Sequence, residues 1–239
     1  MRRYILLTTL FTGLIVSAWS ISIYDIQYTA FPGSDNTYPS QYAGKSVSTE
    51  GIITAVNYKS GGFFISESVA GPFTGLLVLE RRSDVQVGDR IRLSGVVQES
   101  FGMTTLQDIT SLRILERNHP LPKPANLTTA QITHSVEAEA YESVYARVHS
   151  VSASGQKSTR NRLLVSDGTG MCTISLGNFG STNINPTKST GNQYSSITGI
   201  VTFSFGEFAL NPVSGSDIEV HQPVSVQNRS WGKIKSIYK

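Results

Sequence analysis

Apolar residues along this chain alternate with polar ones or form short β-branched runs, and they seldom recur at the spacing of an amphipathic helix. This pattern predicts two sets of five strands, separated by glycine-containing turns. The first set covers 47–56, 62–66, 75–80, 89–100 and 103–109, and the second covers 143–151, 162–167, 171–176, 194–204 and 207–213. Helical signal is confined to a turn at 128–132 or 136–143, so the chain is expected to be all-β.

The two sets of strands contain a repeat. Residues 94–114 recur without a gap at 198–218, an offset of 104 positions (198 minus 94). The identical pairs are Gly95/Gly199, Val97/Val201, Ser100/Ser204, Phe101/Phe205, Gly102/Gly206, Leu106/Leu210 and Ile114/Ile218. The repeat predicts two copies of one small module. Five strands that close into a barrel leave no long exposed edge, so we expect two tandem five-stranded barrels.

The other segments divide the chain around these modules. Residues 1–20 have the features of a secretory signal: a positive start, an apolar stretch at 4–16 too short to span a bilayer, and a small-x-small ending. The alternative is an uncleaved N-terminal anchor, and no later segment is apolar enough to cross a membrane. We therefore expect a secreted, cell-surface or periplasmic bacterial protein. The predicted modules are 21–116 and 127–220, joined by the proline-rich linker 117–126 and followed by the basic tail 221–239.

Net charge argues only weakly for an anionic partner. The chain carries 20 basic and 17 acidic side chains, and removal of a signal containing Arg2 and Arg3 leaves 18 against 17. The basic excess then lies in the tail 221–239, which has four basic side chains and no acidic one. The tail is interpreted either as a sorting or attachment signal or as a disordered end.

Catalytic and metal-binding patterns are absent from the sequence. The acidic residues are scattered without metal-ligand spacing, the four histidines form no ligand pair, and no nucleophile elbow or phosphate loop occurs. The single cysteine, Cys172, occupies an inward position of an alternating strand, where a buried and inert thiol is expected. The sequence therefore predicts a non-enzymatic protein without a metal or cofactor.

Four segments occur in a suggestive order: YDIQYT at 24–29, the strand pattern at 42–67, VGDRIRLSGVVQESFGMTTL at 87–106, and the segment 127–151. Together they resemble the OB-fold domains found beside the catalytic domains of secreted bacterial endonucleases and exonucleases. LLVSDGTGMCTISL at 163–176 is also similar to the hairpin of strands 2 and 3 in nucleic-acid-binding OB domains. The nuclease domain of those proteins is not part of this sequence, so the resemblance implies accessory binding modules and not nuclease activity.

An OB barrel binds ligands on the outer face of strands 2 and 3 and in the flanking 1–2 and 4–5 loops, with aromatic rings and basic side chains. In the second module, inward-facing Val144, Ala146 and Val148 would turn the residues between them outward. The candidate contacts there are Tyr145, Arg147, His149, Lys157, Arg160 and Arg162. The alternative is an ordinary solvated strand face.

The equivalent candidates of the first module are Tyr58, Lys59, Phe64, Arg81 and Arg82. This module is net acidic, so its site ranks below that of the second module.

Phe101 and Phe205 recur in the turns between strands 4 and 5. They either stack on nucleobases or plug the ends of the barrels. The plug is favoured because both copies keep the ring while the nearby charges differ. If the second module binds a strand, Phe205 is the ring expected to stack on it.

The sequence thus favours a secreted, non-catalytic protein of two OB modules that binds nucleic acid, with single-stranded or extracellular DNA as the expected ligand. One alternative is an adhesion or interaction protein that binds carbohydrate or a surface protein. Another is an accessory subunit of a separately encoded nuclease.

Overall fold

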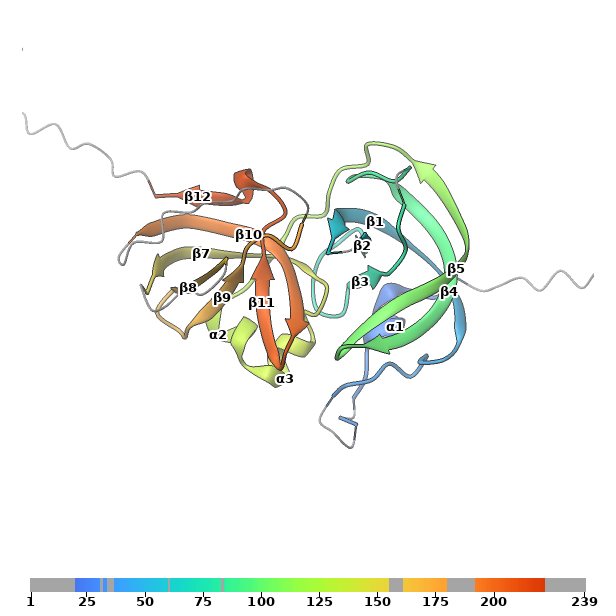
Figure 1. Cartoon of the computed structure of the whole chain (residues 1–239), viewed down its shortest axis with the longest axis horizontal. Coiled ribbons are helices and arrows are strands. Elements are labelled where there is room, and N and C mark those ends of the chain that lie inside the picture. Colours follow the sequence, from blue (N-terminus) through green and yellow to red (C-terminus); the bar gives the residue numbers. More distant parts are fainter. Residues whose placement is uncertain are drawn as a thin grey trace, which may run out of the picture.

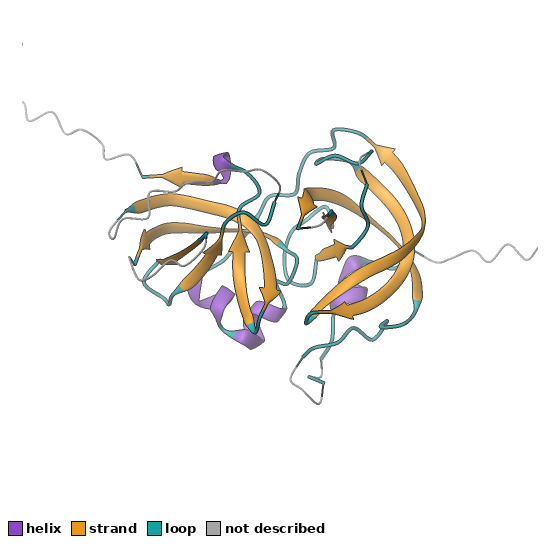
Figure 2. Cartoon of the chain, viewed as in Figure 1, coloured by secondary structure: helices purple, strands orange, loops and turns teal. Residues whose placement is uncertain are grey.

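The computed structural model describes residues 20–30, 32–33, 37–59, 61–82, 84–154, 161–179 and 192–221. Strands are the main regular structure of these residues, and the helices are short (Figure 2). The predicted signal segment lies outside the described residues except for Ser20, and so does the predicted tail except for His221. The described strands form two barrels side by side (Figure 1).

The first barrel, called barrel 1, is a closed ring in the order β1-β2-β3-β5-β4. Its strands are β1 (Ser46–Tyr58), β2 (Gly62–Ser66), β3 (Gly75–Val78), β4 (Arg90–Ser100) and β5 (Met103–Glu116). Neighbouring strands are antiparallel except for the short parallel pair of β3 and β5.

The second barrel, called barrel 2, repeats this topology. Its strands are β7 (Tyr145–Ala153), β8 (Arg162–Ser166), β9 (Cys172–Ser175), β10 (Gln193–Ser204) and β11 (Glu207–Asn211). The pairing of β10 with β7 closes the ring, and β9 and β11 form the parallel pair. Two short strands, β6 (Ala125–Asn126) and β12 (Ile218–Val220), extend the sheet. Two five-stranded barrels of this topology are OB folds in tandem, which confirms the predicted fold class.

A short helical segment covers one end of each barrel core. In barrel 1 this is α1 (Ile23–Gln27), which the strand pattern did not predict and which buries Ile23 and Ile26. In barrel 2, α2 (Thr129–Thr133) and α3 (Ser135–Glu139) lie together below the strands in Figure 1 and bury Ile132 and Ala138. A capping box between Thr128 and Gln131 begins α2. The turn 215–217 forms the short 3-10 helix η1 (Gly215–Asp217).

Each barrel has its own apolar core, built from the inward-facing positions of its strands. Val144, Ala146 and Val148 are completely buried, as the alternation predicted. Cys172 is buried in the core of barrel 2, and desolvation raises the pKa of its thiol to about 12. The thiolate is therefore scarce at neutral pH, in agreement with the expected inert thiol.

A third apolar cluster joins the two barrels. Its buried members are Ala55, Tyr58, Phe64, Leu77 and Met103 from barrel 1, with Phe179 and Ile200 from barrel 2. The Phe179 ring lies 5.3 Å from the Tyr58 ring and 5.9 Å from the Phe64 ring, between centroids. The barrels thus share an aromatic contact that removes several large side chains from water.

Close backbone contacts accompany this cluster. The Lys59 N–H donates to the Asn178 carbonyl oxygen at 2.8 Å, and the Phe73 N–H donates to the Ala140 carbonyl oxygen at 2.6 Å. A Cβ atom at Gly75 would lie 2.1 Å from the carbonyl oxygen of Ser143, so only glycine permits this approach. Within the described residues, no helix is long and apolar enough to span a bilayer.

Candidate nucleic-acid interface

The outer face of β2 and β3 in barrel 1, where a ligand was expected, is covered by barrel 2. Phe64 is 0% exposed and Tyr58 is 3% exposed, and both belong to the inter-barrel cluster. The expectation that these two rings contact a ligand is therefore wrong, because barrel 2 occupies the surface they would offer. Every residue of β2 is buried, which is the pattern of a strand covered on both faces.

The basic candidates of barrel 1, unlike the two rings, are at least partly exposed. Lys59 is exposed, and its Nζ lies 5.0 Å from the centroid of the Tyr58 ring. Arg82 forms an ion pair with Asp84 at 2.7 Å, which raises its pKa, while Arg81 is exposed. Of these three, only Lys59 reaches the hollow described below.

The same outer face is open in barrel 2. Residues of β8 alternate between half-buried and buried, so one side of this strand faces outward. The strand registers place Phe64 opposite Leu77 in barrel 1 and Leu164 opposite Thr173 in barrel 2. A pair of large apolar side chains at the covered face thus corresponds to a smaller and more polar pair at the open one.

A hollow of about 350 Å³, called the barrel 2 hollow, lies on this side of the molecule. It is lined by Lys59, Asn161, Arg162, Ser175, Leu176, Gly177, Asn178, Thr202, Ser204, Phe205, Glu207 and Ala209. Three sequence-predicted residues, Lys59, Arg162 and Phe205, meet here. Most of the other lining side chains carry hydroxyl or amide groups. The hollow therefore combines an aromatic ring, basic groups and neutral hydrogen-bonding groups.

Phe205 stands at the tip of the two-residue turn between β10 and β11. Its φ is 53° and that of Gly206 is 80°, which is a type I′ turn with both residues in the left-handed region. Asn-Gly suits this turn best, and a phenylalanine in it is strained by roughly 1–2 kcal/mol. The ring is nevertheless 104% exposed, so the strain is not offset by burial.

Phe101 repeats this geometry in the turn between β4 and β5. Its φ is 56°, that of Gly102 is 79°, and the ring is 96% exposed. The interpretation of both rings as barrel plugs is wrong, because a plug would be buried. Two-residue turns place the ring at the far end of the hairpin, pointing away from the core.

Arg162 and Glu207 form an ion pair within the hollow, with Nη2 and Oε2 2.6 Å apart. Desolvation opposes ionisation of Glu207, but hydrogen bonds from Thr173 and Arg162 hold the pKa of its carboxyl below the usual range. Both side chains are a little under half exposed, so the pair is open to water and to a competing anion. A phosphate could therefore contact the free face of the Arg162 guanidinium.

The other candidates of barrel 2 do not line the hollow. Tyr145 is half-buried against the inter-barrel cluster, and burial raises its pKa. The Arg147 Nε donates to the Thr198 hydroxyl at 2.7 Å, and exposed His149 has Nε2 at 2.9 Å from Asn126 Oδ1. These contacts support the alternative of an ordinary strand face for the three residues. Lys157 and Arg160 lie outside the described residues.

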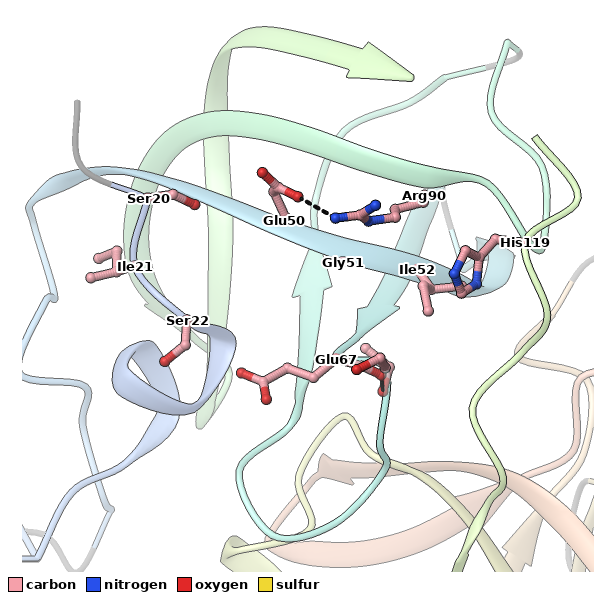
Figure 3. A pocket seen from close by; sticks show the side chains of 11 residues that line it. Ser20, Ile21, Ser22, Glu50, Gly51, Ile52, Glu67, Arg90 and His119 are labelled. Carbon is pink, nitrogen blue, oxygen red and sulfur yellow. Dashed lines mark hydrogen bonds and ion pairs between the residues drawn. The ribbon is translucent and has the colours of Figure 1, made fainter. Parts of the chain in front are cut away.

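A larger hollow of about 480 Å³ lies on barrel 1 (Figure 3). Glu50 forms ion pairs there with Arg90, at 3.1 Å, and with Arg92. The Glu67 carboxylate accepts a hydrogen bond from the Tyr24 N–H at 3.0 Å, and His119 lies at the far end beside Ile52. Two carboxylates against one lining arginine do not suit a phosphate. No group of three or more His, Cys, Asp or Glu side chains in the described part of the chain is placed to hold a metal ion.

No family model and no curated protein matches the chain. Among solved structures, a murine DNA-binding protein bound to double-stranded DNA is similar at 12% identity and a TM-score of 0.35, over 76% of this chain and 99% of that one. The p204 HINb domain gives 11% identity and 0.33, over 75% and 97%. The p202 HIN1 domain in complex with a 12-mer double-stranded DNA gives 16% and 0.33, over 80% and 100%. TM-scores this low indicate only a loose superposition of the backbones. A function for this chain therefore has to be inferred from its own residues.

Sequence reasoning missed the polar part of the hollow, which includes Ser175, Asn178, Thr202 and Ser204. These residues come from β9, the segment after it, and β10, and nothing in their spacing marks them as a group. A signal for the covered face of barrel 1 was present, however. GFFIS at 62–66 and GLLV at 75–78 are continuous apolar runs, which indicate strands buried on both faces.

Proposed function

We propose that this chain binds nucleic acid through the barrel 2 hollow, with an unpaired strand lying against the outer face of barrel 2. The observation that carries the proposal is the exposed, strained ring of Phe205 beside Lys59 and Arg162. A ring kept in solvent at a cost in backbone strain is explained by a contact made outside the chain. Lys59 and Arg162 would meet phosphates, and the hydroxyl and amide groups would meet base edges and sugars.

An unpaired strand suits this arrangement better than a duplex. One exposed ring on a hairpin tip can stack on a base only when that base is unstacked from its neighbours, as in single strands. We further propose that the binding is non-catalytic and that the protein acts after export, as the signal-like segment 1–20 suggests. The sequence resemblance also predicts that the chain is related to nuclease accessory modules or acts as an accessory subunit of a separate nuclease. Both stay predictions.

A second candidate ligand is an oligosaccharide. The observation that favours it is the number of neutral hydrogen-bonding side chains in the hollow, together with the ion pair that partly neutralises Arg162. Aromatic rings also stack on sugars, and OB barrels bind oligosaccharides. The two candidates differ in their response to salt.

The test is a fluorescence-anisotropy titration with a labelled oligothymidine at several salt concentrations. Binding to a single strand is expected to weaken with salt with a log–log slope of about −0.7 per neutralised phosphate. Phe205→Ala is expected to weaken binding by about 1–3 kcal/mol, or roughly 5-fold to 150-fold. Phe101→Ala is the matched control, because it removes an equally exposed ring from the equivalent turn, outside the barrel 2 hollow.

A salt-independent affinity, or equal losses from the two alanine variants, would refute the nucleic-acid site. If a neutral glycan displaces the oligothymidine equally well at low and high salt, the result would instead support an oligosaccharide as the ligand of the barrel 2 hollow.

A further inference from the structure

A different hollow lies between the two Phe-Gly turns, at the junction of the barrels. Its volume is about 360 Å³, and we call it the inter-turn hollow. It is lined by Thr37, Tyr38, Gly102, Ser135, Val136, Glu139, Phe203, Gly206 and Phe208. A Cβ at Gly102 would lie 2.7 Å from the Phe203 ring, so the two hairpins touch. In Figure 1 the lower end of β4–β5 lies toward the β10–β11 turn, on the side where α3 is drawn.

Three aromatic rings form part of this lining. Tyr38, Phe203 and Phe208 contribute to the walls, with the centroids of the two phenylalanine rings 4.9 Å apart and their planes tilted by 55°. The exposed rings of Phe101 and Phe205 directly precede the two lining glycines. The face of an aromatic ring carries partial negative charge and attracts cations.

Glu139, near the end of α3, is the one side chain with a formal charge in this lining. Within the described residues, no hydrogen bond or ion pair reaches its carboxyl. The titratable groups that act on it are other acids: Glu99 on β4, and Glu142, which follows α3 and is buried. The carboxyl therefore lies among aromatic, hydroxyl-bearing and acidic side chains, and no described residue supplies a counter-ion.

We propose that the inter-turn hollow binds an organic cation, an alkylammonium group held by the Glu139 carboxylate and the surrounding aromatic rings. A cation would relieve the repulsion among the three acids and gain attraction from the rings, whereas a phosphate would be repelled. The volume lies within the range of small-ligand sites, which often form at interfaces between domains. The alkylammonium group is either a small amine or the side chain of a lysine in a peptide. This site is independent of the barrel 2 hollow.

The protonation of Glu139 supplies a second measurable property. Desolvation and the charge of Glu99 raise the pKa of Glu139 to about 7. A bound cation favours the ionised carboxylate, so binding near neutral pH should release a proton, and affinity should rise with pH through about 7.

The experiment is isothermal titration of the full chain with choline chloride, with sodium chloride of equal ionic strength as the reference. A blocked lysine-containing tripeptide is titrated in parallel to separate a small amine from a peptide side chain. Glu139→Gln removes the charge at similar size, and Glu137→Gln is the matched control because Glu137 is an exposed acid on the same helix. The titration is repeated in two buffers that differ in ionisation enthalpy, because the difference in measured heat gives the number of protons released on binding.

Saturable binding of either probe is expected, stronger at pH 8 than at pH 6, and weakened roughly tenfold or more by Glu139→Gln but not by Glu137→Gln. Absence of saturable binding by both probes at pH 8 would overturn the proposal. Equal affinity in wild type and Glu139→Gln would overturn it too, since that substitution buries no new group and is expected to leave the fold intact.

Discussion

The two barrels have the same strand order, the same single parallel pair of strands and the same Phe-Gly turn, but one face is buried in barrel 1 and open in barrel 2. In barrel 1 the outer face of the second and third strands is apolar and buried against barrel 2. In barrel 2 the corresponding face carries both apolar and polar side chains, and part of it lines the barrel 2 hollow. The duplicated backbone therefore allows either an internal interface or a ligand surface, and the outward side chains decide between them.

The two faces are expected to differ most in how much their outward side chains contribute to stability. Phe64→Ala removes a ring that is 0% exposed from the inter-barrel cluster, and we expect a loss of about 3–5 kcal/mol in the free energy of unfolding. Leu164→Ala at the equivalent, half-buried position of barrel 2 is expected to cost about 1–2 kcal/mol. Chemical denaturation measures both. Equal losses would mean that the two faces are energetically alike.

The two turns provide a second and smaller test. Phe205→Asn is expected to weaken binding of oligothymidine by about 1–3 kcal/mol, because the stacking ring is lost. The same substitution should stabilise the fold by up to about 1 kcal/mol, because asparagine tolerates the left-handed conformation. Phe101→Asn should give the same gain in stability without the loss of binding. A loss of stability in both variants would show that the exposed rings pack within the chain.

The junction between the barrels is expected to respond to pH. The raised pKa of Glu139, about 7, means that the folded state holds a proton that the unfolded chain releases near 4.5. Its contribution to stability is thus fully present below pH 4.5 and is lost as pH rises through about 7. Desolvation shifts the pKa of Glu142 in the same direction. Denaturation midpoints measured from pH 4 to 8 should fall less in Glu139→Gln than in wild type or in Glu137→Gln.

The smallest expected effect concerns the ion pair in the barrel 2 hollow. Arg162→Gln should change stability by no more than about 0.5–1 kcal/mol, because exposed ion pairs contribute little. Its effect on binding should appear as a decrease of about 0.7 in the magnitude of the salt slope for a single strand. Arg82→Gln is the control, since Arg82 is ion-paired with Asp84 but does not line the hollow. An identical slope in both variants would place the Arg162 guanidinium away from the phosphates.

Several residues of the candidate site could be predicted from the sequence, but their arrangement in space could not. Lys59, Arg162 and Phe205 were predicted from residue type and strand position, and the structure brings them to one hollow. Tyr58 and Phe64 were predicted on the same reasoning and are buried. The difference arises because strand parity indicates which side chains leave a barrel core. Strand parity carries no information about which segment of the chain covers the outer face.

The barrel strands, the two-barrel architecture and the inward positions of each core could be inferred before the structure, because they depend on local alternation and on a duplicated segment. Two features are visible only in the folded chain: Phe179 and Ile200 cover the outer face of barrel 1, and the two Phe-Gly turns line one hollow with Glu139. These contacts join residues that are far apart in the sequence, such as Phe64 and Phe179. They depend on how two finished barrels pack together, which no local pattern of hydrophobicity specifies.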